Sequence, residues 1–415
     1  MFLETTLRRN PALIDTAIDL HGAGRIGPNT FVVDLDRISA NARANAEMAG
    51  RLGLRLQAMT KQHGRNPFVA LAAVEAGIGG IVTVDVSEAR ILARHGLPIA
   101  HVGHLVQIPA ADTVDVLAMR PSAWTVFSLT AAERVSAAAL AVGRRQDVLI
   151  RVWKPGDFLH PGQEGGFRLE AVAEAGARIS RLPGVRVAGV TSFPCLLWDA
   201  DAAVVRPTGN LDSVAEAARI LRDDVGLDLD QINAPGVTCV GTMPIVAARG
   251  ATHVEPGSAL SGHTPLHATQ DEPELPAMVY VSEIASVDAH TAYCFGGGFY
   301  ARSRLRSALL AGTKGRRIVP ALQPPAEAID YYGTLDVAEG PAPSVGDTAV
   351  FAFRSQVFVG RCQVAVVGGI ASNSPGILGI FDQHGNLLGP DQLPVGASTA
   401  AAQVRERWAE YVHTQ

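Results

Sequence analysis

The strongest constraint on the fold is a regular alternation of two kinds of segment between residues 54 and 257. Eight short segments rich in β-branched residues are candidate strands: 54–59, 80–85, 99–103, 123–127, 147–153, 185–192, 229–234 and 252–257. Alanine-rich stretches with apolar residues at helical spacing lie between them. Strands that alternate with helices predict parallel βαβ units, and about eight such units predict a TIM-type (β/α)8 barrel. The alternative is an open doubly wound sheet, which usually contains fewer units.

The pattern changes near residue 275, where the helical spacing stops. Residues 278–295, 348–360 and 361–370 read as strands, and helical spacing returns only at 398–412. We therefore expect a β-rich, barrel-like second domain of about 140 residues. The chain begins with an amphipathic helix that is expected to end near residues 22–24. The predicted division is an N-terminal helical segment (1–29), a (β/α)8 barrel (30–275), and a β-rich C-terminal domain with a terminal helix (276–415).

Charge and cysteine content argue against several classes of function. The formal net charge is -5 and no long basic run occurs, which argues against nucleic acid as the main partner. The four cysteines lie far apart and fit neither a disulfide framework nor a zinc finger. Charges interrupt the apolar pattern of the N-terminus too early for a signal peptide or a spanning helix. We expect a cytoplasmic protein with no membrane partner.

Lys61 lies where the first barrel strand would open into its loop. In a TIM-type barrel the working residues lie at the C-terminal ends of the strands. A lysine that is partly buried there has a lowered pKa, which makes its amine a better nucleophile. The alternative is a surface lysine that merely begins the loop.

Three segments in order carry a resemblance to a known family: 29–49, 58–64 and 76–92. They resemble the N-terminal domain of alanine racemase-like, fold-type III pyridoxal-phosphate enzymes, and the likeness covers about residues 30 to 265. The whole chain, including residues 8–20, is similar to the YhfX-type subgroup of amino-acid racemase-like proteins. The resemblance implies that pyridoxal 5'-phosphate is the cofactor and that Lys61 forms its internal aldimine. It also implies a homodimer with shared active sites.

The resemblance further implies a phosphate cradle after the seventh candidate strand. Gly236 permits close backbone approach, and Thr238 falls where the family has the second hydroxyl of its phosphate-binding loop. Arg65 stands four residues after Lys61, where alanine racemases have a phosphate-binding tyrosine, and its positive charge could act on the phosphate instead. The alternative for this loop is an ordinary Gly/Pro turn.

Residues 255–257 depart from alanine racemases in an informative way. Alanine racemases read R-P-G here, and their arginine faces the pyridine nitrogen of the cofactor. This chain reads Glu255-Pro256-Gly257, which resembles the E-P-G of the decarboxylases of the same fold. A carboxylate against that nitrogen keeps it protonated, which strengthens the ring as an electron sink and widens the accessible chemistry. The backbone amides of Gly257 and Ser258 would add to the phosphate site.

Racemisation needs a second proton donor on the face of Cα opposite Lys61. In this fold that group comes from the second domain of a partner subunit. Tyr332 aligns with the catalytic cysteine of the decarboxylases and ranks first, followed by Cys294 and Tyr300 near the position of the racemase tyrosine. The alternative for Tyr332 is a packing role beside Tyr331.

Substrate contacts are expected from other strand ends. Arg151 could bind a carboxylate bidentately, and Ser192 replaces a histidine that the family has beside the cofactor ring. His101 and His104 suggest a metal site, but no acidic or cysteine partner lies near them in the sequence. We therefore interpret them as loop histidines and expect no metal.

The sequence therefore predicts an isomerase, an amino-acid racemase in which Lys61 and Tyr332 transfer the Cα proton on opposite faces. The first alternative is a decarboxylase, aldolase or dehydratase on the same scaffold, which the E-P-G supports and the missing decarboxylase cysteine opposes. A second alternative of another class is a non-catalytic pyridoxal-phosphate-binding protein of vitamin B6 homeostasis. Such proteins resemble the barrel alone, so the additional β-rich domain argues against it.

Overall fold

The computed structural model describes residues 1–414 of the 415-residue chain, and these residues form two compact units. The barrel unit consists of residues 43–60 and 73–259. The β-rich unit consists of residues 1–42, 61–72 and the chain from residue 260 onward. Among the helices of residues 1–414, none combines the length and the apolar character needed to cross a membrane.

The barrel unit is built on a parallel sheet whose two ends belong to one strand. The order of hydrogen-bonded strands is β2-β13-β12-β9-β7-β6-β5-β4-β3. A single residue, Gln57, separates β2 from β3, so the path returns to its starting strand. The bounds are β2 (Arg55–Leu56), β3 (Ala58–Met59), β4 (Ile81–Val82), β5 (Ile99–Val102), β6 (Ala123–Val126), β7 (Gln146–Trp153), β9 (Val185–Thr191), β12 (Gln231–Asn233) and β13 (His253–Val254). Each of the eight predicted segments overlaps one of these strands, except that the first contains both β2 and β3, and the predicted TIM-type barrel is confirmed.

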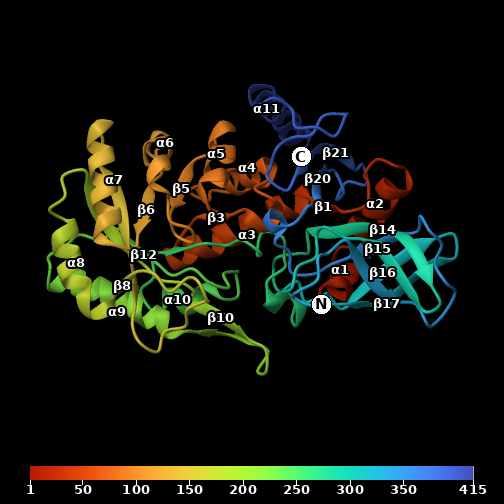
Figure 1. Ribbon diagram of the computed structural model, residues 1–415, viewed down its shortest axis with the longest axis horizontal. Helices are drawn as coiled ribbons and strands as arrows, with labels where there is room; N and C mark the ends of the chain where they lie inside the picture. Colours follow the sequence, from red (N-terminus) through yellow and green to blue (C-terminus); the bar gives the residue numbers. More distant parts are fainter. Residues whose placement is uncertain (415) are drawn as a thin grey trace. The chain divides into compact units, whose positions relative to one another are not determined.

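Helices follow the strands where the sequence supplies caps and apolar faces. Asp85 accepts a hydrogen bond from the backbone N of Glu88 (2.8 Å) at the start of α5, and Ser128 accepts one from Ala131 N (3.1 Å) at the start of α7. The helices of this unit are α5 (Val86–Arg94), α6 (Thr113–Ala118), α7 (Leu129–Ala141), α8 (Val172–Ile179), α9 (Gly209–Asp223) and α10 (Met243–Ala247), with 3-10 turns at Ala110–Asp112 and Leu169–Ala171. Helices α5 to α9 contact one another in order around the strands (Figure 1). Three short strands lie in the loops of this unit: β8 (Phe167–Arg168), which pairs with β7, and β10 (Leu196–Asp199) and β11 (Val204–Pro207), which pair with each other.

The β-rich unit contains a ring of six antiparallel strands, in the order β14-β15-β18-β17-β16-β19 and back to β14. The bounds are β14 (Met278–Asp288), β15 (Thr291–Phe295), β16 (Ser307–Gly312), β17 (Gly315–Leu322), β18 (Tyr332–Asp336) and β19 (Thr348–Phe351). Strands β1 (Thr30–Asp34), β20 (Gln363–Gly368) and β21 (Gly376–Asp382) extend the sheet from β14. The predicted β-rich, barrel-like domain is confirmed. The linear division at residues 30 and 275 stays a prediction, but β1 pairs with β14 and β20 and not with a barrel strand.

Helices at both ends of the chain belong to the β-rich unit. The N-terminal helical segment is two helices, α1 (Leu3–Arg9) and α2 (Pro11–Gly22), because Asn10 caps α2 and Pro11 begins it. Leu13 and Ala17 of α2 share a buried cluster with Val32 and Val281 of the sheet. Helix α11 (Ala397–Thr414) is the predicted terminal helix. The remaining elements are α3 (Leu35–Leu52) and α4 (Pro67–Glu75), with 3-10 turns at Lys61–His63, Pro265–Ala268 and Val357–Val359.

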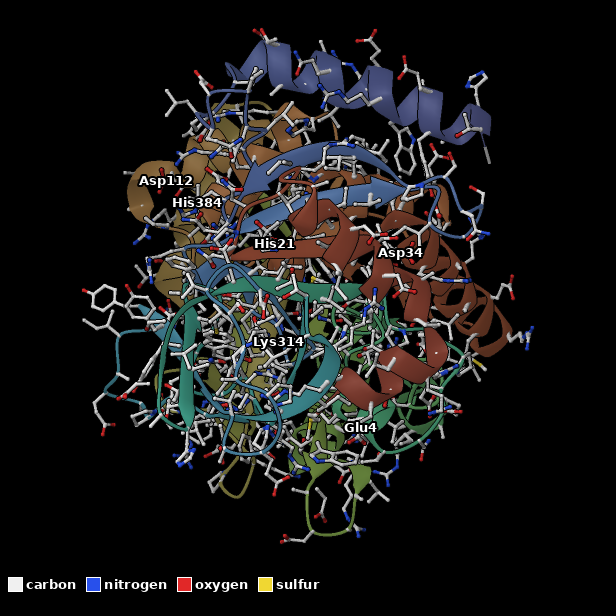
Figure 2. All side chains as sticks on the ribbon, turned by 90° about the vertical axis from the view of Figure 1, so that its right-hand side faces the viewer. Glu4, His21, Asp34, Asp112, Lys314 and His384 are labelled. Carbon is white, nitrogen blue, oxygen red and sulfur yellow. The ribbon has the colours of Figure 1, made fainter. Side chains whose placement is uncertain are left out.

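Two aspartates explain the V-D-L-D pattern at the start of α3. Asp34, labelled in Figure 2, is fully buried and accepts hydrogen bonds from Asn10 Nδ2 (2.9 Å) and Arg37 N (3.1 Å). Burial raises the pKa of Asp34 to about 6, although these hydrogen bonds oppose the rise. Asp36 accepts from the hydroxyl of Tyr411 on α11 (2.9 Å). In this chain the pattern therefore has a structural role within the β-rich unit.

Candidate functional site

Polar side chains collect at the C-terminal ends of the barrel strands. They are all buried: Thr83, His101, Thr125, Arg151, Thr191, Asn233 and Glu255. A parallel barrel brings the C-terminal ends of its strands to one face, and loops from this face supply the working residues of such barrels. Because buried polar groups cost free energy unless they are paired, a set this large at one face is typical of a binding site.

Glu255 is the centre of this set. Its carboxylate accepts hydrogen bonds from Asn233 Nδ2 (2.8 Å) and pairs with His101 Nδ1 (2.9 Å), and the second ring nitrogen of His101 pairs with Thr125 Oγ1 (2.6 Å). His104 Nε2 lies 3.6 Å from the other carboxylate oxygen. Burial alone would raise the pKa of Glu255, but the charge of His104 and the hydrogen bond and charge of His101 outweigh it and lower the pKa to about 2. Glu255 is therefore an ionised carboxylate at neutral pH.

The interpretation of His101 and His104 as histidines without an acidic partner is wrong. Glu255 lies beside both rings, although it is 154 residues from His101 in the sequence. The ligand atoms of the three side chains all lie within 4.8 Å of one another, a spacing that a metal ion could bridge. The cluster could not be seen in the sequence because its members lie in distant segments. His101 lies on β5, His104 lies in the loop after β5, and Glu255 directly follows β13. The expected absence of a metal stays a prediction.

Lys61 follows the first barrel strand by two residues and begins a 3-10 turn (Lys61–His63). Thr60, the residue before it, donates from its hydroxyl to the carboxylate of Glu88 (2.6 Å), which also accepts from Val84 N (2.7 Å). Glu88 is fully buried, so it fixes the strand end that leads into Lys61. Sequence reasoning gave Glu88 no role, although the family pattern S-x-x-E-A contains it.

The chain contains two lysines besides Lys61, and both lie on the protein surface or in a turn. The sequence contains three, and Lys154 pairs with Glu216 on the surface (3.2 Å). Lys314, labelled in Figure 2, lies in the turn between β16 and β17 and donates to Ala342 O (2.6 Å). Lys61 is half-buried. Lys154 is half-buried as well and directly follows barrel strand β7, so position separates Lys61 from Lys314 only, and the choice of Lys61 stays a prediction from the family resemblance.

The loop after β12 was predicted to cradle a phosphate. Thr238 is buried, and within residues 1–414 its hydroxyl has no hydrogen-bond partner. A buried hydroxyl in that condition favours a ligand atom as its partner. A Cβ added to Gly236 would lie 2.6 Å from Leu196 N, so the close backbone approach that requires this glycine is made to the chain itself. Gly257 is buried and Ser258 half-buried directly after Glu255, and Pro256 O accepts from Met59 N (2.9 Å).

Arg65 lies in the β-rich unit and has partners there. Its Nη1 is 3.1 Å from Nδ1 of His384, which Figure 2 labels, and its guanidinium lies 5.7 Å from the ring centre of Phe358. The side chain is buried, and the backbone has a positive φ of 57°. A phosphate-binding role for Arg65 stays a prediction.

Two predicted substrate contacts lie in the barrel unit. Ser192 is buried after β9, and its hydroxyl oxygen accepts a hydrogen bond from Asn210 Nδ2 (3.0 Å). Arg151 is 1% exposed near the end of β7 and donates to Gln163 O (2.8 Å). Their roles toward a substrate stay predictions.

The three candidates for the second acid or base differ in exposure. Tyr332 is 54% exposed at the start of β18 and contacts Phe295 across the strand pair, with 6.1 Å between ring centres. Cys294 is fully buried, and burial raises the pKa of its thiol to about 11. Burial also raises the pKa of Tyr300, and the nearby guanidinium of Arg354, which donates to its hydroxyl (2.6 Å), opposes that rise. Exposure on this unit therefore favours Tyr332 as a residue that a second molecule can reach.

Comparisons with known proteins agree with this architecture. The alanine racemase N-terminal domain matches residues 33–265, and the YhfX-like C-terminal domain matches residues 279–377. The uncharacterized protein YhfX of Escherichia coli (strain K12) is 43% identical over 391 residues, which are 94% of this chain and 100% of that protein.

Solved structures with the same fold include enzymes of different kinds. A D-threonine aldolase from Filomicrobium marinum matches with a TM-score of 0.67 and 18% identity, over 86% of this chain and 94% of that chain. A D-threo-3-hydroxyaspartate dehydratase from Delftia sp. HT23 matches with a TM-score of 0.61 and 18% identity, over 86% and 97%. An alanine racemase from Corynebacterium glutamicum matches with a TM-score of 0.57 and 19% identity, over 78% and 90%. Identities this low establish the fold alone.

Proposed function

The chain belongs to the alanine racemase-like family with a YhfX-like C-terminal domain, and we propose that it is an amino-acid racemase that uses pyridoxal 5'-phosphate. The family depends on this cofactor. The observation that carries the use of this cofactor is the ionised, buried Glu255 at the C-terminal face of a barrel whose first strand leads into Lys61, and the choice of a racemase rests on the exposed Tyr332 in place of the decarboxylase cysteine. The buried Thr238 hydroxyl without a protein partner in residues 1–414 also fits a phosphate group.

In the proposed proton transfer at Cα, Lys61, Glu255 and Thr238 would each have a different role. Pyridoxal phosphate, when bound, supplies a ring that accepts negative charge from the substrate Cα. Lys61 would hold the cofactor through its amine and move the Cα proton on one face. Glu255 would hold a proton at the ring nitrogen, and His101 and Asn233 orient its carboxylate through their hydrogen bonds. Thr238, with the amides of Gly257 and Ser258, would bind the phosphate.

A second subunit would supply the proton on the opposite face. Tyr332 contacts Phe295, and both are exposed apolar side chains of the β-rich unit, in which Leu322, Ile329 and Tyr331 are exposed as well. Exposed apolar patches of this kind mark interaction surfaces. We propose a homodimer in which Tyr332 reaches the active site of the partner. A cytoplasmic location stays a prediction.

The same residues would serve a decarboxylase, aldolase or dehydratase. The similarity to an aldolase and a dehydratase of this fold, together with the carboxylate of Glu255, favours this second candidate. A non-catalytic cofactor-binding protein is the third candidate.

The first experiment asks whether Lys61 holds the cofactor. Borohydride reduction of the purified protein followed by peptide mass spectrometry is expected to find one pyridoxyl group, on Lys61. Lys154→Ala and Lys314→Ala are matched controls that keep the label, whereas Lys61→Ala loses it. A label on another residue, or none, contradicts all three candidate functions.

The second experiment separates the candidates. The protein is incubated in D2O with single enantiomers of a panel of amino acids, and chirality and Cα deuteration are followed by chromatography and NMR. Racemase activity gives deuterated product of both configurations. Release of CO2, aldehyde or ammonia without inversion identifies the second candidate, and a labelled Lys61 with no reaction identifies the third.

A further inference from the structure

Arg151 is a buried cation whose donors are mostly unused. Its guanidinium carries five N–H donors. Nη2 donates to Gln163 O at 2.8 Å and Nη1 reaches His104 O at 3.5 Å, whereas Nε has no partner in residues 1–414. The side chain is 1% exposed, so water does not replace the missing acceptors at the surface. Buried donors without acceptors indicate a ligand that supplies them.

The positive charge of Arg151 has no acidic counter-ion among residues 1–414. Within residues 1–414 no ion pair joins this guanidinium to a carboxylate, and its neighbours include the ring of Phe127 (4.8 Å to its centre), the carbonyls above and Cys195, whose thiol is kept neutral by burial. Burial accordingly lowers the pKa of Arg151 to about 10. A buried charge is costly unless it is paired. The carboxylate of Glu255 does not pair with Arg151, because it pairs with His101 and His104.

The loop that contains Gly165 and Gly166 packs closely against Arg151 and Phe127. A Cβ on Gly166 would lie 2.9 Å from Arg151 O and 3.0 Å from its Cγ, and a Cβ on Gly165 would lie 2.7 Å from the ring of Phe127. Gly166 also has a positive φ of 128°, which favours glycine. Two consecutive glycines therefore let the backbone that carries Gln163 lie close against the guanidinium and its aromatic neighbour.

Arg151 is separate from the loop assigned to the phosphate. It lies on β7, and β9 stands between that strand and β12, after which Gly236 and Thr238 follow. It is also joined to the central carboxylate, because Nη1 reaches the backbone of His104 and the His104 ring lies 3.6 Å from Glu255. A group bound by Arg151 is therefore a neighbour of the Glu255 network and distinct from the phosphate.

We propose that Arg151 is the carboxylate-binding group of the substrate site. A planar guanidinium with adjacent free donors binds a carboxylate through two parallel N–H···O bonds. The bound anion neutralises the buried charge, replaces the weak contact to His104 O and satisfies Nε. This inference rests on the proposed function, because it assigns the anion to an amino-acid substrate. The carboxylate comes either from the α-carbon or from the end of an acidic side chain.

Calorimetric titration of the full-length protein with its cofactor tests the inference by binding. The ligand pairs are alanine against alaninamide, which differ in the α-carboxylate, and aspartate against asparagine, which differ in the side-chain carboxylate. In the wild-type protein the carboxylate member of one pair is expected to bind about 10- to 100-fold more tightly, the range of a charge-assisted hydrogen bond. Preference within the first pair identifies the α-carboxylate, and preference within the second identifies an acidic side chain.

Arg151→Gln is expected to abolish that preference, and Arg151→Lys, which keeps the charge without the planar fork, to retain part of it. Arg168→Gln is the matched control, since Arg168 is exposed and pairs with Glu170, and it leaves the preference unchanged. Arg151→Gln should not lower the melting temperature, because it removes an uncompensated buried charge. A preference that survives both Arg151 variants overturns the inference, as does the absence of any preference in the wild type.

The readout also separates this inference from the proposed function. Loss of the carboxylate preference in Arg151→Gln supports the subsite even if no amino acid is racemised. Racemisation with an unchanged preference in the variant overturns the subsite and leaves the proposed function standing.

Discussion

Replacing Glu255 with glutamine removes a buried negative charge and keeps the size of the side chain. The folded pKa of Glu255 is lowered from the ordinary 4.5 to about 2 by His104, His101 and Asn233 acting against burial. Between these two values the unfolded chain binds more protons than the folded chain. The stability that Glu255 contributes is therefore fully present above pH 4.5 and is lost as the pH falls toward 2.

The size of the effect follows from the shift. At about 1.4 kcal/mol per pKa unit, the ionised carboxylate contributes about 3 kcal/mol to the free energy of unfolding at pH 7 and about 1 kcal/mol at pH 3. Glu255→Gln should therefore cost most at neutral pH, and the difference from wild type should shrink by about 2 kcal/mol between pH 7 and pH 3.

Urea unfolding of the full-length wild type and variant at pH 7, 5, 4 and 3 measures this difference. Glu216→Gln is the control, since Glu216 is a half-exposed partner of Lys154 in the same unit and its difference should stay within about 0.5 kcal/mol. A stability difference for Glu255→Gln that does not change with pH would refute the reasoning. It would mean that the pKa of Glu255 is not lowered by folding, so the carboxylate would not be held ionised by its histidines.

Three further predictions concern other parts of the molecule. The pKa of Asp34 is raised to about 6 in the folded protein, so the stability that Asp34 contributes is present below pH 4 and is lost as the pH rises to 6. In Asp34→Asn the free energy of unfolding should no longer show this loss of about 3 kcal/mol. The same pH dependence of unfolding in wild type and variant would contradict this prediction. A Cβ on Gly189 would lie 1.8 Å from Gln231 O, so Gly189→Ala should lower the free energy of unfolding, measured by thermal unfolding, by about 3 kcal/mol or more. Gly50 lies in helix α3 with open space around it, so Gly50→Ala should raise the free energy of unfolding by about 0.5 kcal/mol. Tyr332→Phe keeps the ring against Phe295 and removes the hydroxyl, so Cα deuteration on one face should slow about 100-fold or more while Tyr331→Phe stays near wild type; equal rates in both variants exclude Tyr332 as the second acid.

The eight barrel strands could be read from the sequence because their signal is local. Each strand is a short β-branched run, and the helices between them carry their own caps, such as Asp85 and Ser128. The β-rich character after residue 275 and the terminal helix are local in the same sense. Lys61, Thr238 and Glu255 could be proposed because each follows a recognisable strand and lies in a segment that resembles the family.

Contacts between distant segments could not be read in this way. The strand at 30–34 looks like the first member of the βα series, yet its backbone pairs with β14 and β20, because hydrogen bonding between strands depends on partners far along the chain. His101 is 154 residues from Glu255 in the sequence, and closure of the barrel places the carboxylate of Glu255 2.9 Å from its ring. The buried charge of Arg151 likewise became evident only when its neighbours were known.

The sequence by itself determined the secondary structure of the barrel, the family resemblance and the residue types available for chemistry, since these depend on periodicity and on motifs within a few residues. The tertiary structure decided how those residues are paired: Glu255 with two histidines, Glu88 with Thr60, and Arg151 with no acid in residues 1–414. Ionisation depends on burial and on charges within a few ångströms, and folding sets both by joining segments that the sequence keeps apart.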